Sequence, residues 1–199
     1  MPASKPSNPA RPVNDNDNDK DNDSKTLSAD DIHQAIERLA AAIRSRQRSG
    51  KRKLVLLGIA NGGIELARRL GSRIRSAKVG TIDISFHRDD IGRHPIPKEY
   101  TPTLIPIDID DANVVLVDDV LFSGRTINAA LNELFDHGRP ACVELAILVD
   151  RGGRRLPIAA DFTGITLDVE DSDKVVVKLG ADNAAATDSI VVKAEGLKT

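Results

Sequence analysis

The sequence VVLVDDVLFSGRT at residues 114–126 decides the expected fold. Its first four residues are apolar and three of them are valine, which is typical of a short strand buried on both faces of a sheet. Asp118 and Asp119 follow this run, and a glycine-containing turn at residues 122–126 leads straight into an apolar pattern of helical spacing. A strand, a turn and a helix in this order predict an α/β protein whose ligand site lies beyond the carboxyl end of the strand.

The two acids and the turn together predict a ligand that carries both a phosphate and neighbouring hydroxyl groups. Free N–H groups and the helix dipole attract an anion at a helix N-terminus, where the Ser123 and Thr126 hydroxyls can also donate to phosphate oxygens. Asp118 and Asp119 can accept hydrogen bonds from the 2- and 3-hydroxyls of a ribose 5-phosphate. The alternative is a buried strand that ends in a solvated acidic turn. The candidate binding residues are Val114, Val115, Leu116, Val117, Asp118, Asp119, Val120, Leu121, Phe122, Ser123, Gly124, Arg125 and Thr126.

Length and composition predict one cytoplasmic domain with an aliphatic core. The chain has 199 residues, 40% of them hydrophobic and only 3% aromatic, which suits Ala-rich helices packed on a parallel sheet. Cys142 is the single cysteine, so no disulfide can form within the chain, and we expect it to be an inert residue inside an apolar strand. No apolar run approaches the roughly 18 residues of a membrane span, and the first residues lack the apolar region of a signal peptide. We therefore expect no membrane partner.

Positive charge is concentrated in one part of the chain. Residues 38–78 hold twelve Lys or Arg residues and one acid, Glu65, although the whole chain has a net charge of −2. A polyanion such as RNA is attracted by such a segment, because phosphate neutralisation drives nucleic-acid affinity. The alternative is a set of solvated helix faces rich in arginine. The RNA-binding candidates are Arg44, Arg46, Arg48, Arg68, Arg69, Arg73 and Arg75.

The N-terminal composition predicts a tail before the folded domain. Residues 1–25 are mainly Pro, Asn, Asp and Ser and can bury little apolar surface, so we expect them to be disordered. The domain itself is expected at residues 26–182, with a C-terminal strand or tail at 183–199. Its first helix begins at a capping box formed by Ser28 and Asp31 and ends near residue 48.

A second unit of strand, glycine turn and helix precedes the central one. An apolar run at residues 54–59 predicts the strand, and an apolar stripe at residues 64–70 predicts the helix. The N–H groups of the turn could approach another phosphate, most simply the pyrophosphate of the same ligand, whereas the alternative is an ordinary turn with a left-handed glycine. The turn consists of Ala60, Asn61, Gly62 and Gly63.

A long irregular segment follows the next predicted strand. Residues 79–86 alternate apolar and polar side chains, which indicates a half-buried strand. Residues 87–111 contain four prolines and no helical period, and a loop of this length in a compact domain is typical of a lid. Arg88, near its start, is expected to help close a charged ligand site. The alternative is a solvated loop held by salt bridges.

Beyond the central motif, the sequence predicts where the helix that follows the motif ends, and it predicts four further strands. The helix is expected to end at residue 137, before a glycine and a proline. Asp150 and Arg151 follow the first of the strands, which again places polar groups at the carboxyl end of a strand. The strands are expected at residues 143–149, 161–165, 174–179 and 189–193.

The central motif resembles the phosphoribosyl-pyrophosphate (PRPP) motif of type I phosphoribosyltransferases. Further segments resemble the PyrR family, the pyrimidine-operon regulators that are also uracil phosphoribosyltransferases, and the likeness covers residues 27–179. The resemblance implies a type I phosphoribosyltransferase fold, with a central, mostly parallel sheet flanked by helices and a long lid loop. The further segments are DISFHRDD at 83–90, ELFDHGRP at 133–140 and LVDRGGRRLPIAADFTG at 148–164.

The resemblance also implies a role for each candidate residue. Asp118 and Asp119 would hold the ribose hydroxyls, residues 123–126 the 5-phosphate and residues 60–63 the pyrophosphate, while Arg88 would reach the ligand from the lid. Mg²⁺ would arrive with PRPP, without dedicated protein ligands. The residues implied near the ligand and the base are Arg139, Asp150, Arg151 and Thr163.

Two functions are compatible with this resemblance. The first is bifunctional: a uracil phosphoribosyltransferase that makes UMP and pyrophosphate from uracil and PRPP, and a nucleotide-dependent RNA-binding regulator of pyrimidine biosynthesis genes. The alternative is a non-catalytic RNA-binding regulator that senses UMP or PRPP. Residues 60–63 lack the arginine that this loop carries in the best-known members, so weak catalysis is expected. Either function implies an mRNA leader as a partner and a homodimer or a larger homo-oligomer.

Overall fold

The computed structural model describes residues 26–47, 52–85, 102–181 and 187–194. The predicted tail at residues 1–25, Arg48 and the lid residue Arg88 lie outside the described residues. The described elements are β1 (Thr26–Leu27), α1 (Ala29–Gln47), β2 (Leu54–Ile59), α2 (Gly62–Arg73), β3 (Ala77–Ile82), β4 (Asn113–Leu121), α3 (Arg125–His137), β5 (Cys142–Asp150), β6 (Phe162–Thr166), β7 (Lys174–Lys178) and β8 (Ser189–Lys193).

Five parallel strands form the main sheet, in the order β3-β2-β4-β5-β6. Chain order runs outward in both directions from the neighbouring strands β2 and β4. The carboxyl ends of these two strands therefore flank the switch point at which open α/β sheets bind ligands. The predicted α/β fold with a mostly parallel sheet is confirmed.

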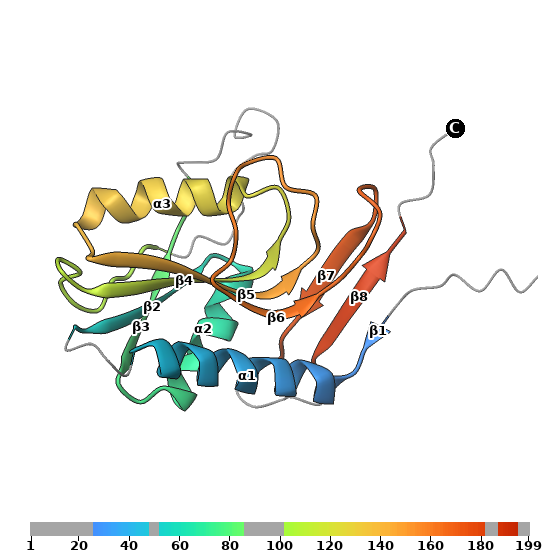
Figure 1. Ribbon diagram of the computed structural model, residues 1–199, viewed down its shortest axis with the longest axis horizontal. Helices are drawn as coiled ribbons and strands as arrows, with labels where there is room; N and C mark the ends of the chain where they lie inside the picture. The colour runs from blue at the N-terminus through green and yellow to red at the C-terminus, as the bar shows by residue number, and fades with distance from the viewer. Residues whose placement is uncertain (1–25, 48–51, 86–101, 182–186, 195–199) are drawn as a thin grey trace, which may run out of the picture.

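Helices cover both faces of the main sheet, with α1 and α2 on one side and α3 on the other (Figure 1). The alternation of side chains along each buried strand produces these two layers. Leu56 and Val115 pack in the cluster that includes α1 and α2, whereas Leu57 and Leu116 pack in the cluster that includes α3. Burial on both faces explains why β2 and residues 114–117 of β4 are continuous apolar runs.

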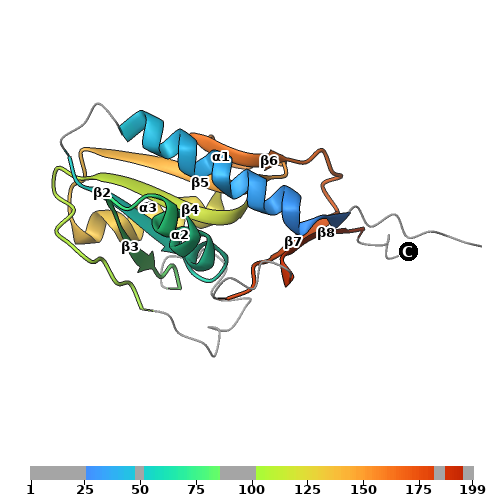
Figure 2. The same cartoon turned by 90° about the horizontal axis from the view of Figure 1, so that it is seen from below.

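A second, antiparallel sheet has the order β1-β8-β7 and lies beside the N-terminal end of α1 (Figure 2). Ile190 and Val192 of β8 pack in the same apolar cluster as α1. Arg69 of α2 also reaches this sheet, where its Nη1 donates to Oδ2 of the buried Asp188 at 2.5 Å. The predicted strand at residues 189–193 is confirmed as β8.

Two local predictions differ from the structure. β3 spans Ala77–Ile82 rather than residues 79–86, because the Asp83 amide leaves the strand ladder and donates to Thr103 Oγ1 at 2.9 Å. Cys142 is the first residue of β5 and is exposed, so it is not an interior residue of an apolar strand. None of the helices in the described ranges has the length and apolar composition needed to cross a membrane.

Candidate active site

Asp118 and Asp119 lie within β4, and not after it as the sequence predicted. β4 continues to residue 121 because its pairing with β5 extends that far. Its pairing with β2 stops earlier, at Val117 opposite Gly58. The two acids therefore occupy the part of β4 that no longer has β2 as a neighbour, and they line a cavity there.

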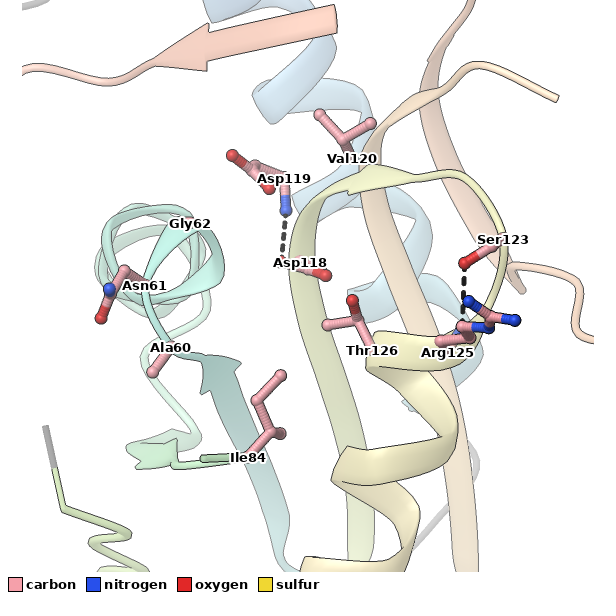
Figure 3. A pocket seen from close by; sticks show the side chains of 10 residues that line it. All are labelled: Ala60, Asn61, Gly62, Ile84, Asp118, Asp119, Val120, Ser123, Arg125 and Thr126. Carbon is pink, nitrogen blue, oxygen red and sulfur yellow. Dashed lines mark hydrogen bonds between the residues drawn. The ribbon is translucent and has the colours of Figure 1, made fainter. Parts of the chain in front are cut away.

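The two acids form a close pair in this cavity. The Asp119 amide donates to Asp118 Oδ1 at 3.0 Å (Figure 3), and Asp118 is only 6% exposed. Burial, together with the charge of Asp119, raises the pKa of Asp118 well above its usual range, and burial also raises the pKa of Asp119. Hydroxyl donors or a cation would stabilise the ionised pair, because either would replace the water that burial removes.

The turn before α3 supplies an anion-binding geometry. Gly124 is the residue before the helix and has φ 89°, a left-handed conformation that glycine adopts without steric cost. The Asn128 amide donates to the Gly124 carbonyl at 3.0 Å, and the Arg125 amide lies 3.3 Å from Ser123 Oγ. Ser123, Arg125 and Thr126 all line the cavity, where the helix dipole favours a phosphate.

The loop at residues 60–63 faces the two acids from the N-terminus of α2. A side chain at Gly62 would overlap the Asp119 carboxyl group, and one at Gly63 would overlap the Val117 carbonyl. Neither glycine has a positive φ, so the alternative of a left-handed turn is wrong, and close backbone approach is what requires glycine here. The peptide bond between Ala60 and Asn61 is cis.

The two acids, the turn at residues 122–126 and the loop at residues 60–63 line one cavity of about 430 Å³ (Figure 3). We call residues 122–126 the phosphate turn, after the ligand group that the sequence predicts for them. Figure 3 shows Asp118 and Asp119 on β4, between the loop that carries Asn61 and the first turn of α3. Sequence reasoning missed one lining residue, Ile84, because residues 79–86 were expected to continue as a strand. The lining residues are Ala60, Asn61, Gly62, Ile84, Asp118, Asp119, Val120, Ser123, Arg125 and Thr126.

The rest of the thirteen-residue motif supports the cavity from behind. Val114, Val115, Leu116, Val117 and Leu121 are buried in the core. The ring of Phe122 packs against the guanidinium of Arg151, the residue that follows β5. The guanidinium carbon lies 4.0 Å from the ring centroid. These side chains fix the position of the acids and the turn, and they do not line the cavity.

The four residues implied near the ligand and the base do not line the cavity. Arg139 lies beyond the C-terminal end of α3, about 20 Å along the helix from the phosphate turn by the rise per residue. The structure thus corrects the implied position of Arg139. Asp150 pairs with Arg154 at the end of β5, Arg151 is buried against the turn, and Thr163 is exposed on β6, two strands away from β4.

Most of the described RNA-binding candidates contact acids. Arg46, Arg68 and Arg73 form ion pairs with N–O distances of 2.8, 3.7 and 2.6 Å, respectively. Arg69 has a side chain that is only 11% exposed, and it pairs with the fully buried side chain of Asp188. This geometry argues against Arg69 as an RNA contact, because its charge is already neutralised inside the protein.

Arg44 and Arg75 are exposed, and neither forms an ion pair with another described residue. Arg44 Nη1 donates to the carbonyl of Arg73 at 3.1 Å, which joins the C-terminal part of α1 to the end of α2. These two arginines therefore present their charge on one part of the surface, where two helices end.

Comparison with known proteins identifies the family. Residues 28–184 match the family described as Phosphoribosyl transferase domain, so the chain is a member of the phosphoribosyltransferases. A Bifunctional protein PyrR from Thermosynechococcus vestitus is 46% identical over 77% of this chain and 86% of its own length. Another, from Streptomyces coelicolor, is 47% identical over 81% of this chain and 86% of its own length. Within the phosphoribosyltransferases, the chain belongs to the PyrR family.

Solved phosphoribosyltransferase structures share the fold. A hypoxanthine phosphoribosyltransferase from Trypanosoma cruzi matches with a TM-score of 0.60 at 21% identity, over 85% of this chain and 91% of its own. A hypoxanthine-guanine phosphoribosyltransferase from Bacillus anthracis matches with a TM-score of 0.58 at 20% identity, over 72% of this chain and 82% of its own. The predicted phosphoribosyltransferase fold is thus confirmed.

Proposed function

We propose that the chain is a uracil phosphoribosyltransferase, which converts uracil and PRPP to UMP and pyrophosphate, and a nucleotide-dependent RNA-binding regulator of pyrimidine biosynthesis genes. The observation that carries the transferase function is that Asp118, Asp119 and the first turn of α3 line one cavity. Acceptors for two hydroxyls beside donors for a phosphate suit a ribose 5-phosphate. The name of the relatives, Bifunctional protein PyrR, supports the pairing of two functions in one chain.

In this proposal the protein acts by positioning and by electrostatics. Asp118 and Asp119 accept hydrogen bonds from the ribose hydroxyls, and residues 123–126 hold the 5-phosphate, so the ribose is fixed while uracil N1 attacks C1 and releases its proton to solvent. The bond from C1 to pyrophosphate breaks with oxocarbenium character, and the two carboxylates stabilise the positive charge that develops on the ring. No protein nucleophile is needed.

The two acids also suit Mg²⁺, the cofactor that we propose to enter with PRPP. Carboxylate oxygens are hard ligands of the kind that Mg²⁺ prefers, and a cation beside them would favour their ionised forms. When bound, Mg²⁺ supplies positive charge for the departing pyrophosphate. Residues 60–63 would contact the pyrophosphate through N–H groups at the N-terminus of α2.

The regulatory function rests on the exposed arginines and on the relatives. Arg44 and Arg75 present unpaired charge where two helices end, which suits the phosphates of an RNA leader.

The alternative function, a non-catalytic regulator that senses UMP or PRPP, is favoured by one observation. Residues 60–63 carry no cationic side chain, and one missing charge-assisted contact to a leaving group costs about 10²-fold in rate.

The test of the base and of catalysis is product formation from PRPP and Mg²⁺ with uracil, hypoxanthine or orotate supplied singly. Formation of UMP from uracil, without turnover of the other two bases, supports the proposal. Turnover of hypoxanthine or orotate in place of uracil contradicts the base assignment. Absence of turnover with every base, together with measurable binding of UMP, supports the non-catalytic regulator instead.

A further inference from the structure

The guanidinium of Arg154, after β5, lies against the back of the phosphate turn. Its Nη1 donates to the carbonyls of Leu121 at 3.2 Å and Phe122 at 3.0 Å. Its Nε donates to the carbonyl of Ile158 at 3.0 Å, and its Nη2 pairs with Asp150 Oδ2 at 2.5 Å. One side chain thus joins the end of β4, the turn and the segment that follows β5.

The next carbonyl of the turn is held from the same side. The amides of Arg155 and Leu156 both donate to the Ser123 carbonyl at 3.0 Å. Three successive carbonyls, at residues 121, 122 and 123, therefore face the segment at residues 150–158. The same segment also packs closely on the turn, because a side chain at Gly124 would contact Leu156 at 3.3 Å.

The direction of these carbonyls determines the direction of the amides. A trans peptide group is planar, and its N–H points opposite to its C=O. The N–H groups of residues 122, 123 and 124 therefore point away from the segment at residues 150–158. Within the described part of the chain these three amides have no hydrogen-bond acceptor, so they are available to an anion.

We propose that Arg154 is a positioning residue that presets the turn for the 5-phosphate. Its charge is balanced by Asp150, its side chain is 24% exposed and it does not line the cavity, so it acts through the turn rather than on the ligand. Holding the carbonyls before binding removes the cost of ordering the turn when the phosphate arrives. This inference rests on the proposed function, because it assigns the turn to the 5-phosphate of PRPP or UMP.

The test compares Arg154→Met with Arg155→Met for binding of UMP and of uridine, which lacks the phosphate. The side chain of Arg155 is 61% exposed and contacts Asp171 at 3.0 Å, and its amide bond to Ser123 is retained in the variant. For Arg154→Met, we expect the Kd of UMP to rise about tenfold, the equivalent of ordering roughly one backbone residue, with the Kd of uridine unchanged. Arg155→Met should change neither Kd.

The variant Arg154→Lys keeps the ion pair with Asp150 but cannot span the separate carbonyls, so it serves if Arg154→Met does not fold. A selective loss of UMP affinity in either variant supports the inference. An unchanged Kd of UMP overturns it, and so does an equal loss for UMP and uridine, which would mark a general structural role. Failure of the wild type to bind UMP would contradict the proposed function itself, and the inference would fall with it.

Discussion

The amide of Asp119 donates to the Asp118 carboxyl group at 3.0 Å, which places two acids of like charge in one buried corner of the cavity. Burial and the charge of Asp119 raise the pKa of Asp118, so ionisation of this pair opposes folding when no ligand is bound. A ligand that offers hydroxyl groups or a cation relieves this repulsion. Binding and stability are therefore coupled at these two residues.

Asp118→Asn is expected to stabilise the ligand-free protein at neutral pH. Because the pKa of Asp118 is raised in the folded state, its ionisation destabilises the fold. This destabilisation is absent below the unfolded pKa of about 3.9, grows as the pH rises through the folded pKa and is complete above the folded pKa. Thermal unfolding between about pH 4 and pH 8 should show a Tm difference that widens with pH, by roughly 2–4 °C for each kcal/mol. Asp168→Asn, at an exposed acid, is the control. A difference that narrows with rising pH would contradict the prediction.

Gly62→Ala should impair the transferase reaction more than it impairs folding. The added methyl group overlaps the Asp119 carboxyl, which can rotate away because it is the end of a flexible side chain. A displaced carboxylate would no longer meet the ribose hydroxyls that we propose it binds, and we expect kcat/KM for PRPP to fall about 10²-fold with little change in Tm. Steady-state kinetics would be compared with Arg68→Ala, on the exposed face of the same helix. Unchanged kinetics would show that the position of Asp119 is not critical.

Arg69→Met should destabilise the protein by about 3–5 kcal/mol, because it leaves the buried Asp188 without its partner. Urea unfolding measures this difference. The neighbouring Arg68→Met is a matched control, since Arg68 is exposed and its pair with Glu65 is 3.7 Å long, and its effect should stay within about 0.5 kcal/mol. Equal effects of the two variants would mean that the buried pair is not a stabilising link between α2 and the second sheet.

The double variant Arg44→Gln/Arg75→Gln should bind RNA with a weaker dependence on salt. Each phosphate contact that is lost lowers the magnitude of the slope of log K against log salt by about 0.7–1, so the loss of two contacts should lower it by roughly 1.4–2. The measurement is the affinity for an mRNA leader of a pyrimidine biosynthesis gene at a series of salt concentrations. Arg155→Gln, at an exposed arginine paired with Asp171, is the control and should leave the slope as it is. An unchanged slope in the double variant would place the RNA surface elsewhere.

Local sequence was sufficient where local interactions decide the structure. The capping box at Ser28 and Asp31 is present, with the Asp31 amide 3.2 Å from Ser28 Oγ, because both partners lie within one turn. The order of strand, turn and helix likewise predicted that Asp118 and Asp119 lie beside the start of α3, and these residues line one cavity in the structure. Short-range patterns were therefore sufficient to predict which residues form the central part of the candidate site.

Contacts between distant residues decided the rest. The end of β4 depends on its pairing with β5, and periodicity within β4 contains no information about that partner. Because Arg69 is charged, the sequence alone indicates a surface residue. In the structure its side chain is buried against Asp188, and no local pattern could predict a partner 119 residues further along the chain. The contacts of Arg154 with the phosphate turn also join separate parts of the chain, so the sequence around residue 154 did not predict them.

The most direct test of the proposed function is UMP formation from uracil, PRPP and Mg²⁺ by the wild type and by Asp118→Asn/Asp119→Asn. We predict turnover by the wild type and a loss of at least about 10²-fold in the double variant, because it lacks both carboxylates that we propose to bind the ribose hydroxyls. Equal turnover by the two proteins would contradict the role of the acids. Absence of turnover by a wild type that binds UMP would contradict catalysis and leave a nucleotide-sensing regulator.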